Sequence, residues 1–132
     1  MGLVGFMNTL AIEGKKYDVK VNCIAPGAAS RMTENLMPPE LLEKMKPEYV
    51  APAVAYMASE ECAFTGTVIS AAGGVFSRVA IMENEGVLLD PARGITIERF
   101  RENLDHITDM SGAEVAEGMG RSMAQLMSLM SH

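Results

Sequence analysis

The sequence predicts an α/β fold, and three observations support this prediction. Residues 17–24 form a partly β-branched segment, with apolar Val19, Val21, Cys23 and Ile24, that ends before the turn signal Pro26-Gly27. Residues 67–71 form a second such run. Segments with apolar residues three and four positions apart, typical of helices, precede, separate and follow these runs. A strand, a helical connection and a second strand predict one parallel βαβ unit with a right-handed crossover.

The first helix is predicted over residues 2–13, and Gly14 ends it, with Lys15 and Lys16 placed to complement the helix dipole. Its apolar face comprises Leu3, Val4, Phe6, Met7, Leu10, Ala11 and Ile12. The strand over residues 17–24 carries apolar residues at both odd and even positions: Val19, Val21, Cys23 and Ile24. Because parallel sheets are covered on both faces, this pattern predicts a strand that is buried on both sides.

The connection between the two strands is predicted to hold two helices. Ser30–Thr33 looks like a helix start, Pro38-Pro39 interrupts the segment, and a short helix is expected over 40–45. A further helix is expected over 47–58, with Pro52 in its first turn, where a missing N–H costs little.

Helices are expected to dominate the remainder. Residues 75–82 alternate weakly and extend or follow the second strand, and Asp90-Pro91 marks a turn. A helix is predicted over 97–107, and Ser111–Glu114 resembles a capping box. The capping box would open a last helix whose apolar side comprises Val115, Met119, Met123, Leu126, Met127 and Met130.

Composition excludes several classes of protein. The 132 residues suit one domain, and the 48% hydrophobic content excludes a disordered chain. No apolar run approaches the ~20 residues of a membrane span, and no convincing signal peptide is present. A net charge of −6 argues against nucleic-acid binding. Cys23 and Cys62 lack disulfide or metal spacing, so we expect reduced thiols, no metal site and a cytoplasmic location.

Six segments carry a resemblance to a known family. They are Met1–Ala11, Val21–Pro26, Ser30–Thr33, Met37–Leu41, Lys46–Pro52 and Ala71–Gly74. In this order they resemble the C-terminal half of short-chain dehydrogenase/reductases, particularly the group that acts on (3R)-hydroxyacyl-CoA thioesters. The resemblance implies an incomplete Rossmann-like fold, the C-terminal βαβ portion of a doubly wound parallel sheet with extra C-terminal helices. It divides a single domain, 1–132, into a dehydrogenase part, 1–82, and a helical tail, 83–132.

The resemblance also implies which functional parts the chain contains. The family's pyrophosphate-binding glycine-rich turn, catalytic Ser and Tyr-x-x-x-Lys pair would all precede Met1, so no catalytic residue is expected here, and NAD(P) is expected to bind only with the N-terminal half supplied. The nicotinamide-side loop would comprise Pro26, Gly27, Ala28, Ser30, Met32 and Thr33. The lid over the substrate would be residues 33–46, with Leu36, Met37, Leu41, Leu42 and Met45 against an acyl chain. Both segments also have a simpler interpretation, as a strand-to-helix turn and a cover for the core.

Two functions therefore compete. In the first, the chain is the C-terminal half of an NAD(P)-dependent oxidoreductase for a 3-hydroxyacyl thioester and is inactive alone; it is either cut from a longer gene or acts with a separately encoded N-terminal half. In the second, it is a non-catalytic half-domain that assembles with itself, because the missing central strands leave an apolar sheet edge and a helix without its partner. Other candidates are interpreted as structural: Tyr17, Tyr49 and Tyr56 as packing residues, and His106 as part of a solvated helix face.

Overall fold

The computed structural model describes residues 1–116, 123 and 126–127, and its contacts separate two compact units, Met1–Val79 and Ala80–His132. Each unit is described by itself. The division at residue 79 lies close to the expected division at residue 82. That the two parts make up a single domain remains a prediction.

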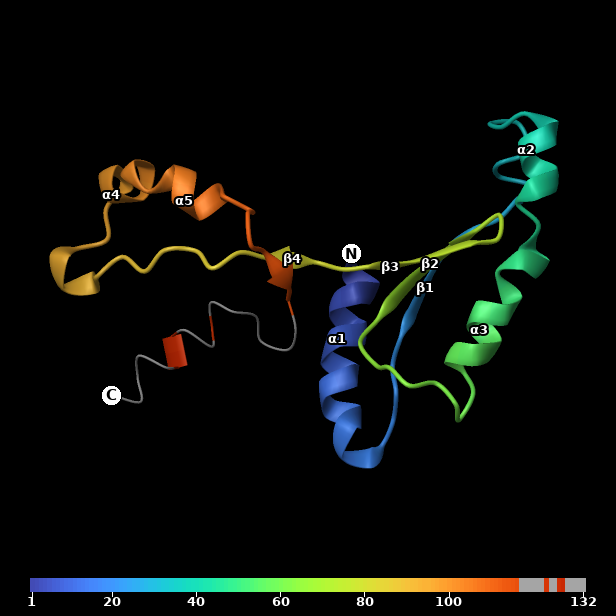
Figure 1. Cartoon of the computed structure of the whole chain (residues 1–132), viewed down its shortest axis with the longest axis horizontal. Helices are drawn as coiled ribbons and strands as arrows, with labels where there is room; N and C mark the ends of the chain where they lie inside the picture. Colours follow the sequence, from blue (N-terminus) through green and yellow to red (C-terminus); the bar gives the residue numbers. More distant parts are fainter. Residues whose placement is uncertain (117–122, 124–125, 128–132) are drawn as a thin grey trace. The chain divides into compact units, whose positions relative to one another are not determined.

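A three-stranded sheet forms the centre of the first unit (Figure 1). Its strands are β1 (Cys23–Gly27), β2 (Val68–Ala72) and β3 (Val75–Val79), in the order β1-β2-β3. β1 and β2 are parallel, and Cys23 pairs with Val68, which confirms the predicted parallel unit. β3 returns antiparallel to β2, so the sheet is mixed.

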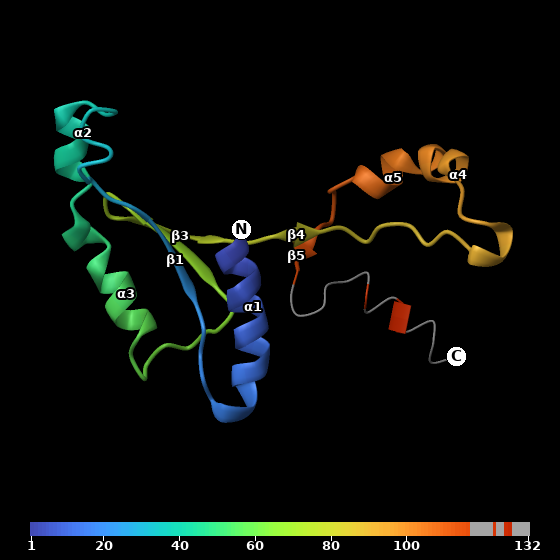
Figure 2. The same cartoon turned by 180° about the vertical axis from the view of Figure 1, so that it is seen from behind.

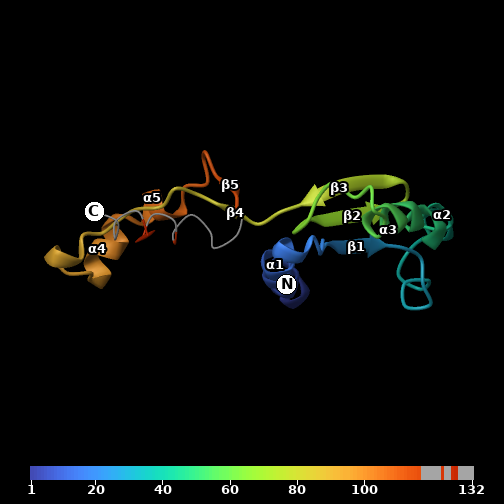
Figure 3. The ribbon, with the colours of Figure 1, turned by 90° about the horizontal axis from the view of Figure 1, so that it is seen from below.

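Helices cover both faces of this sheet. They are α1 (Gly2–Gly14) and α3 (Ala51–Met57), whereas α2 (Pro39–Lys44) lies beyond the end of β1 (Figure 1). Two short 3₁₀ turns are η1 (Lys15–Tyr17) and η2 (Pro47–Tyr49). α1 and α3 lie on opposite faces, which the views from behind and from below both show (Figures 2 and 3). The predicted helix over 47–58 is therefore two pieces, η2 and α3, and Pro52 lies in the first turn of α3, as expected.

The buried core of the first unit is small. α1 contributes Met7 and Ala11, and the segment after α3 contributes Cys62, which is 1% exposed. The other buried residues are Val50, Thr67, Val68 and Ala71. Much apolar surface of α1 stays outside this core, since Leu3 is 75% and Phe6 62% exposed.

The first strand differs from its prediction. It was expected over residues 17–24 and buried on both faces, but β1 begins at Cys23, and Val19 is 53% exposed. No residue of β1 is fully buried in this chain. Pro26 and Gly27 lie within the strand, paired with Ala71 and Ala72, rather than stopping it. A sequence run becomes strand only where a neighbour offers hydrogen bonds, and β2 offers them over this later stretch.

The hairpin between β2 and β3 depends on two glycines. Gly73 and Gly74 have φ values of +56° and +82° and form a two-residue connection between Ala72 and Val75. Positive φ at both central residues is the requirement of the type I′ hairpin turn, which glycine meets without a steric penalty.

The second unit contains a short two-stranded sheet as well as helices. β4 (Met82–Glu83) pairs antiparallel with β5 (Glu114–Val115), and the elements between them are η3 (Pro91–Arg93), α4 (Ile97–Glu102) and α5 (Leu104–Thr108). The Asp90 carboxylate accepts a hydrogen bond from the N–H of Ala92, so the expected turn is present. Asn84 donates side-chain hydrogen bonds to the carbonyl oxygens of Ile107 and Asp109.

Two predictions for this unit are wrong. The helix expected over 97–107 is divided at Asn103 into α4 and α5. The capping box at 111–114 does not start a helix, because Glu114 and Val115 pair with β4. Of the predicted last helix, Met123, Leu126 and Met127 are helical and exposed, whereas Met119 and Met130 lie outside the described residues.

Candidate functional site

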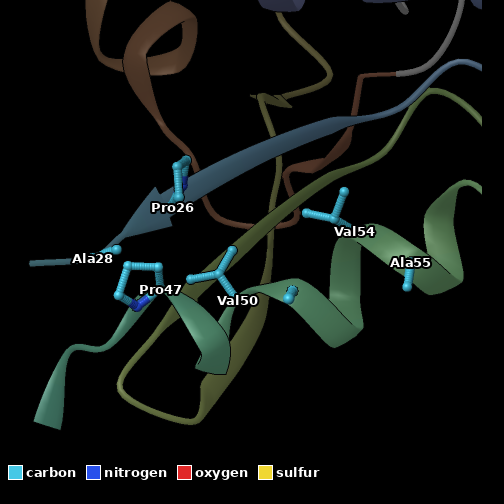
Figure 4. Close-up of a pocket in the computed structure, with 7 residues that line it drawn as sticks. Pro26, Ala28, Pro47, Val50, Val54 and Ala55 are labelled. Carbon is cyan, nitrogen blue, oxygen red and sulfur yellow. The ribbon is translucent and has the colours of Figure 1, made fainter.

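The candidate site lies at the carboxyl end of β1, where ligands bind in open parallel sheets. An apolar groove of about 520 Å³ opens to solvent there, lined by Pro26, Ala28, Pro47, Val50, Ala51, Val54 and Ala55. Val50, between η2 and α3, and Val54 of α3 point toward β1 (Figure 4). None of these seven side chains has an acid–base group, so the groove can hold an apolar surface but cannot transfer a proton.

Gly27 fits tightly between the hairpin and Met45, at the end of α2. A Cβ on Gly27 would stand 2.8 Å from the Cβ of Ala72 and 3.4 Å from the Cε of Met45. Any larger residue would push the strand end away from β2. Close approach of neighbouring chains, rather than an unusual φ, therefore explains the glycine at this position.

The segment after β1 is tied to the end of α2. The N–H of Ala29 donates to the carbonyl oxygen of Met45 at 2.6 Å. On the other side, a Cβ on Gly73 would meet the carbonyl oxygen of Lys44 at 3.2 Å. The end of α2 is thus held between the segment after β1 and the hairpin turn.

Ser30 and Thr33 close a local turn. The Thr33 hydroxyl accepts from the N–H of Ser30 at 2.9 Å and donates to the Ser30 carbonyl oxygen at 3.1 Å. The N–H groups of Thr33 and Glu34 also donate to that carbonyl. The expected helix start is therefore wrong: residues 31–36 form consecutive turns, and the next helix begins at Pro39.

The six residues predicted to bind the nicotinamide divide into three groups. Pro26 and Ala28 line the groove, and Gly27 lies beneath it against Ala72. Ser30 and Thr33 form the turn just beyond. Met32 is 86% exposed. Sequence reasoning missed the α3 side of the groove, because the predicted helix over 47–58 carried no sign of which face would meet β1.

Other predicted residues lie away from the groove. Tyr17 is 71% exposed, with the Lys16 ammonium 4.8 Å from its ring centroid, and Tyr49 and Tyr56 are each about two-fifths exposed. Tyr56 lies against Phe64, with ring centroids 6.0 Å apart, so it packs as expected, although all three tyrosines are partly exposed. The more buried thiol is Cys62 rather than Cys23, and both are free.

Over the described part of the chain, no group of three or more His, Cys, Asp and Glu side chains could hold a metal ion. The pKa of Asp109, in the second unit, lies below its ordinary value, first because the N–H of Ser111 donates to its carboxylate. Asp109 lies outside the candidate site.

The chain is similar to known dehydrogenases, although no family model matches it. It is 47% identical over 116 residues to a short-chain type dehydrogenase/reductase of Mycobacterium tuberculosis, covering 88% of this chain and 40% of that protein. It is 40% identical over 126 residues to the peroxisomal multifunctional enzyme type 2 of Drosophila melanogaster, covering 91% of this chain and 21% of that enzyme.

Solved structures agree with these relatives. The full-length Drosophila enzyme matches 99% of this chain and 24% of its own, with a TM-score of 0.80 and 31% identity. A short-chain dehydrogenase from Mycobacterium avium matches 80% of this chain and 36% of its own, with a TM-score of 0.59 and 27% identity. The chain spans 40% or less of the length of these relatives. It belongs to the short-chain dehydrogenase/reductase family and corresponds to a C-terminal part of the dehydrogenase.

Proposed function

We propose that this chain supplies the nicotinamide-side edge of an NAD(P)-dependent oxidoreductase that acts on a 3-hydroxyacyl thioester, and that it is inactive until the remaining part of the dehydrogenase is supplied. The observation that carries the proposal is the groove at the carboxyl end of β1, beside the 26–33 segment. The relatives support the reaction class, since they include dehydrogenases and a peroxisomal hydratase-dehydrogenase-epimerase.

The residues present fit one end of the cofactor. The apolar walls of Pro26, Ala28 and Val54 suit one face of a flat ring, and the exposed Ser30 hydroxyl, two residues after Ala28 in the sequence, suits a carboxamide. The cofactor, when bound, supplies or accepts the hydride. Along the described part of the chain, no glycine-rich turn joins a strand to a helix start, so the pyrophosphate must be bound by another polypeptide segment.

We also propose a role for α2 and the turns before it. Leu36 is 78% and Leu41 44% exposed, which leaves apolar surface available to an acyl chain. The segment also carries three half-buried apolar side chains, Met37, Leu42 and Met45. The lid would exclude water from the thioester once the substrate is bound.

The experiment compares the chain alone with the chain plus the preceding portion of the Mycobacterium tuberculosis relative. We expect no NAD(P)H formation from a 3-hydroxyacyl-CoA by the chain alone and measurable formation by the mixture. NADH fluorescence titration should show no tight binding to the chain alone. Turnover by the chain alone, or a complete lack of turnover by a stable complex, would contradict the proposal.

A second candidate function is that of a non-catalytic half-domain that assembles with itself. Its support is the exposed apolar surface of α1, where Leu3 is 75% and Phe6 62% exposed. Light scattering decides this candidate, because a folded monomer at micromolar concentration excludes self-assembly. A stable homodimer that fails to combine with the preceding portion of the relative would favour it.

We also propose a reducing compartment such as the cytoplasm, on the ground that Cys23 and Cys62 are both free. Along the described part of the chain, no helix is long and apolar enough to cross a membrane. Several relatives carry the word peroxisomal in their names. Fractionation of the source cells tests this assignment, and recovery of the chain in an organelle fraction would overturn it.

A further inference from the structure

Within the first unit, β3 has a neighbouring strand on one side only. The strand order is β1-β2-β3, so β2 pairs with one edge of β3, and no strand of this unit pairs with the other edge (Figure 3). Every residue of β3 is exposed, and Val75 is 70% and Phe76 50% exposed. An exposed apolar edge strand that lacks proline is a template for pairing with another chain.

The hairpin fixes which backbone groups of β3 face outward. Ala72 and Val75 flank the two-residue turn, and the residues that flank such a turn form a hydrogen-bonded pair. The direction of the backbone groups alternates along an antiparallel strand, so Ser77 also faces β2. Phe76 and Arg78 therefore direct both the N–H and the carbonyl oxygen to the open edge.

The side chains of β3 divide between the two faces of the sheet. Phe76 lines an apolar groove of about 350 Å³ together with residues of α3, so it lies on the face that α3 covers. Arg78 shares this face, because its partner in β2, Ile69, lines the same groove. Val75 and Val79 lie on the opposite face.

A second copy of β3 is complementary to this strand in one register. Antiparallel pairing about a two-fold axis at Ser77 overlaps the whole strand and brings each outward N–H to an outward carbonyl oxygen. Phe76 then lies opposite Arg78 of the second copy, twice, and Val75 lies opposite Val79. Cross-strand β-branched pairs stabilise a sheet, and a guanidinium over an aromatic ring adds attraction. The guanidinium can stack by its face while its edge keeps a partner in its own chain.

The neighbouring registers are poorer. An axis at Arg78 would place the two arginines directly opposite one another, and like charges in that position destabilise a sheet. An axis at Phe76 would set Arg78 and Val79 against the glycines of the turn, where they gain no side-chain partner. A shift by a single residue would set outward-facing groups against groups already bonded to β2.

We infer that the outer edge of β3 is a contact between two copies of this chain, in which the two sheets join edge to edge through pairs of Phe76 and Arg78. The two-fold axis closes the contact, so the product is a dimer and not a fibre. The inference does not depend on the proposed reaction, because β2 separates β3 from β1 and its groove. It also does not depend on the exposed surface of α1. A short strand edge buries little area, so we expect a weak dimer.

Sedimentation of the full chain over micromolar to millimolar concentrations tests the inference. We expect the mass to rise from one chain to two. Phe76→Arg sets like charges opposite one another twice and should weaken the dimer by about tenfold or more. Adding Arg78→Phe to that variant exchanges the two residues, restores the pairs and should recover most of the affinity. A parent chain that stays monomeric at millimolar concentration, or a double variant no tighter than Phe76→Arg, overturns the inference.

A matched control lies on α1. Phe6 is 62% exposed, so Phe6→Arg makes the same change away from β3 and should leave the dimer unchanged. Circular dichroism of each variant shows that it is folded. Loss of the dimer in Phe6→Arg together with its retention in Phe76→Arg would place the contact on α1 and overturn the inference.

Amide hydrogen exchange of the unaltered chain supplies a readout that needs no variant. In a dilute sample, the amide of Ser77, which faces β2, should be protected, and the amides of Phe76 and Arg78 should exchange faster. In a concentrated sample, protection of these two outward amides should rise several-fold, as expected when edge amides join a ladder. Equal exchange of Phe76 and Arg78 in both samples overturns the inference.

Discussion

The backbone N–H of Ala29 donates to the carbonyl oxygen of Met45 at 2.6 Å, and this bond joins the segment after β1 to the end of α2. The two residues are sixteen positions apart, and the turns and α2 lie between them. The bond makes residues 29–45 a closed loop, and the two ends of this loop meet beside Gly27. The end of α2 therefore lies next to the strand end that borders the groove.

The first prediction concerns Gly27. Gly27→Ala should destabilise the chain by about 1–3 kcal/mol, because its Cβ would lie 2.8 Å from the Cβ of Ala72 and force β1 and β2 apart. Urea unfolding measures the change. Gly5→Ala is the control: Gly5 lies within α1, nothing stands within 4 Å of its Cβ, and alanine should stabilise the helix by about 0.5–1 kcal/mol. Equal stability of Gly27→Ala and the parent chain would show that the close contact is absent.

The second prediction concerns the side chain of Asn22. It donates to the carbonyl oxygen of Phe64 at 3.0 Å and accepts from the N–H of Thr67 at 3.1 Å, and so joins the start of β1 to the segment before β2. Asn22→Ala removes both bonds and should lower the free energy of unfolding by about 1–3 kcal/mol. Asn22→Asp keeps the acceptor for Thr67 and loses the donor. Thermal unfolding should therefore rank the parent chain above Asn22→Asp and Asn22→Asp above Asn22→Ala at neutral pH, and a reversed order of the two variants would contradict this.

The third prediction concerns the hairpin turn. Gly73→Val should destabilise the β2–β3 hairpin by about 1–2 kcal/mol, because a β-branched residue resists a φ of +56° and its Cβ would lie 3.2 Å from the Lys44 carbonyl oxygen. Asparagine tolerates this φ better, so Gly73→Asn should lose less. Urea midpoints of the two variants test the order. If Gly73→Asn and Gly73→Val lose similar stability, crowding against the Lys44 carbonyl oxygen, and not the positive φ, explains the need for glycine at residue 73.

The fourth prediction concerns the pH dependence of the second unit. The hydrogen bond from the Ser111 N–H favours the charged carboxylate, so the folded pKa of Asp109 lies below its ordinary value of 3.8. A depressed pKa gives stabilisation that is present above the unfolded pKa and is lost as the pH falls through the folded one. An NMR titration should place the midpoint of Asp109 below 3.8. In Asp109→Asn the Ser111 amide shift should no longer follow this titration, and a midpoint at or above 3.8 in the parent chain would refute the assignment.

Local sequence signals predicted several elements correctly, because the conformation of those elements depends on residues within the element itself. The spacing of Leu3, Met7 and Leu10 defined α1, and Gly14 defined its end. The position of Pro52 in the first turn of α3 follows from its missing N–H, and Gly73-Gly74 permitted the hairpin turn. Each of these depends on a few neighbouring residues.

The errors occurred where long-range pairing decides. β1 starts at Cys23 and continues through Pro26 and Gly27, because β2 offers hydrogen bonds there. Residues 111–114 resemble a capping box, but Glu114 and Val115 form the strand β5. They do so because they pair with Glu83 and Met82 of β4, thirty-one and thirty-three residues earlier. For the candidate site, the sequence indicated the segment from Pro26 to Thr33 but not the wall formed by Val50 and Val54.

The sequence by itself determined the family of this protein, the order of its helices and strands in the first unit, and the segment that borders the groove. Only the tertiary structure decided where β1 begins, which face of α3 meets it, and that the outer edge of β3 lies open in the first unit. The physical reason is that helix spacing and turn chemistry are local. Strand limits, grooves and open edges depend on which distant segment supplies, or does not supply, the next hydrogen bond.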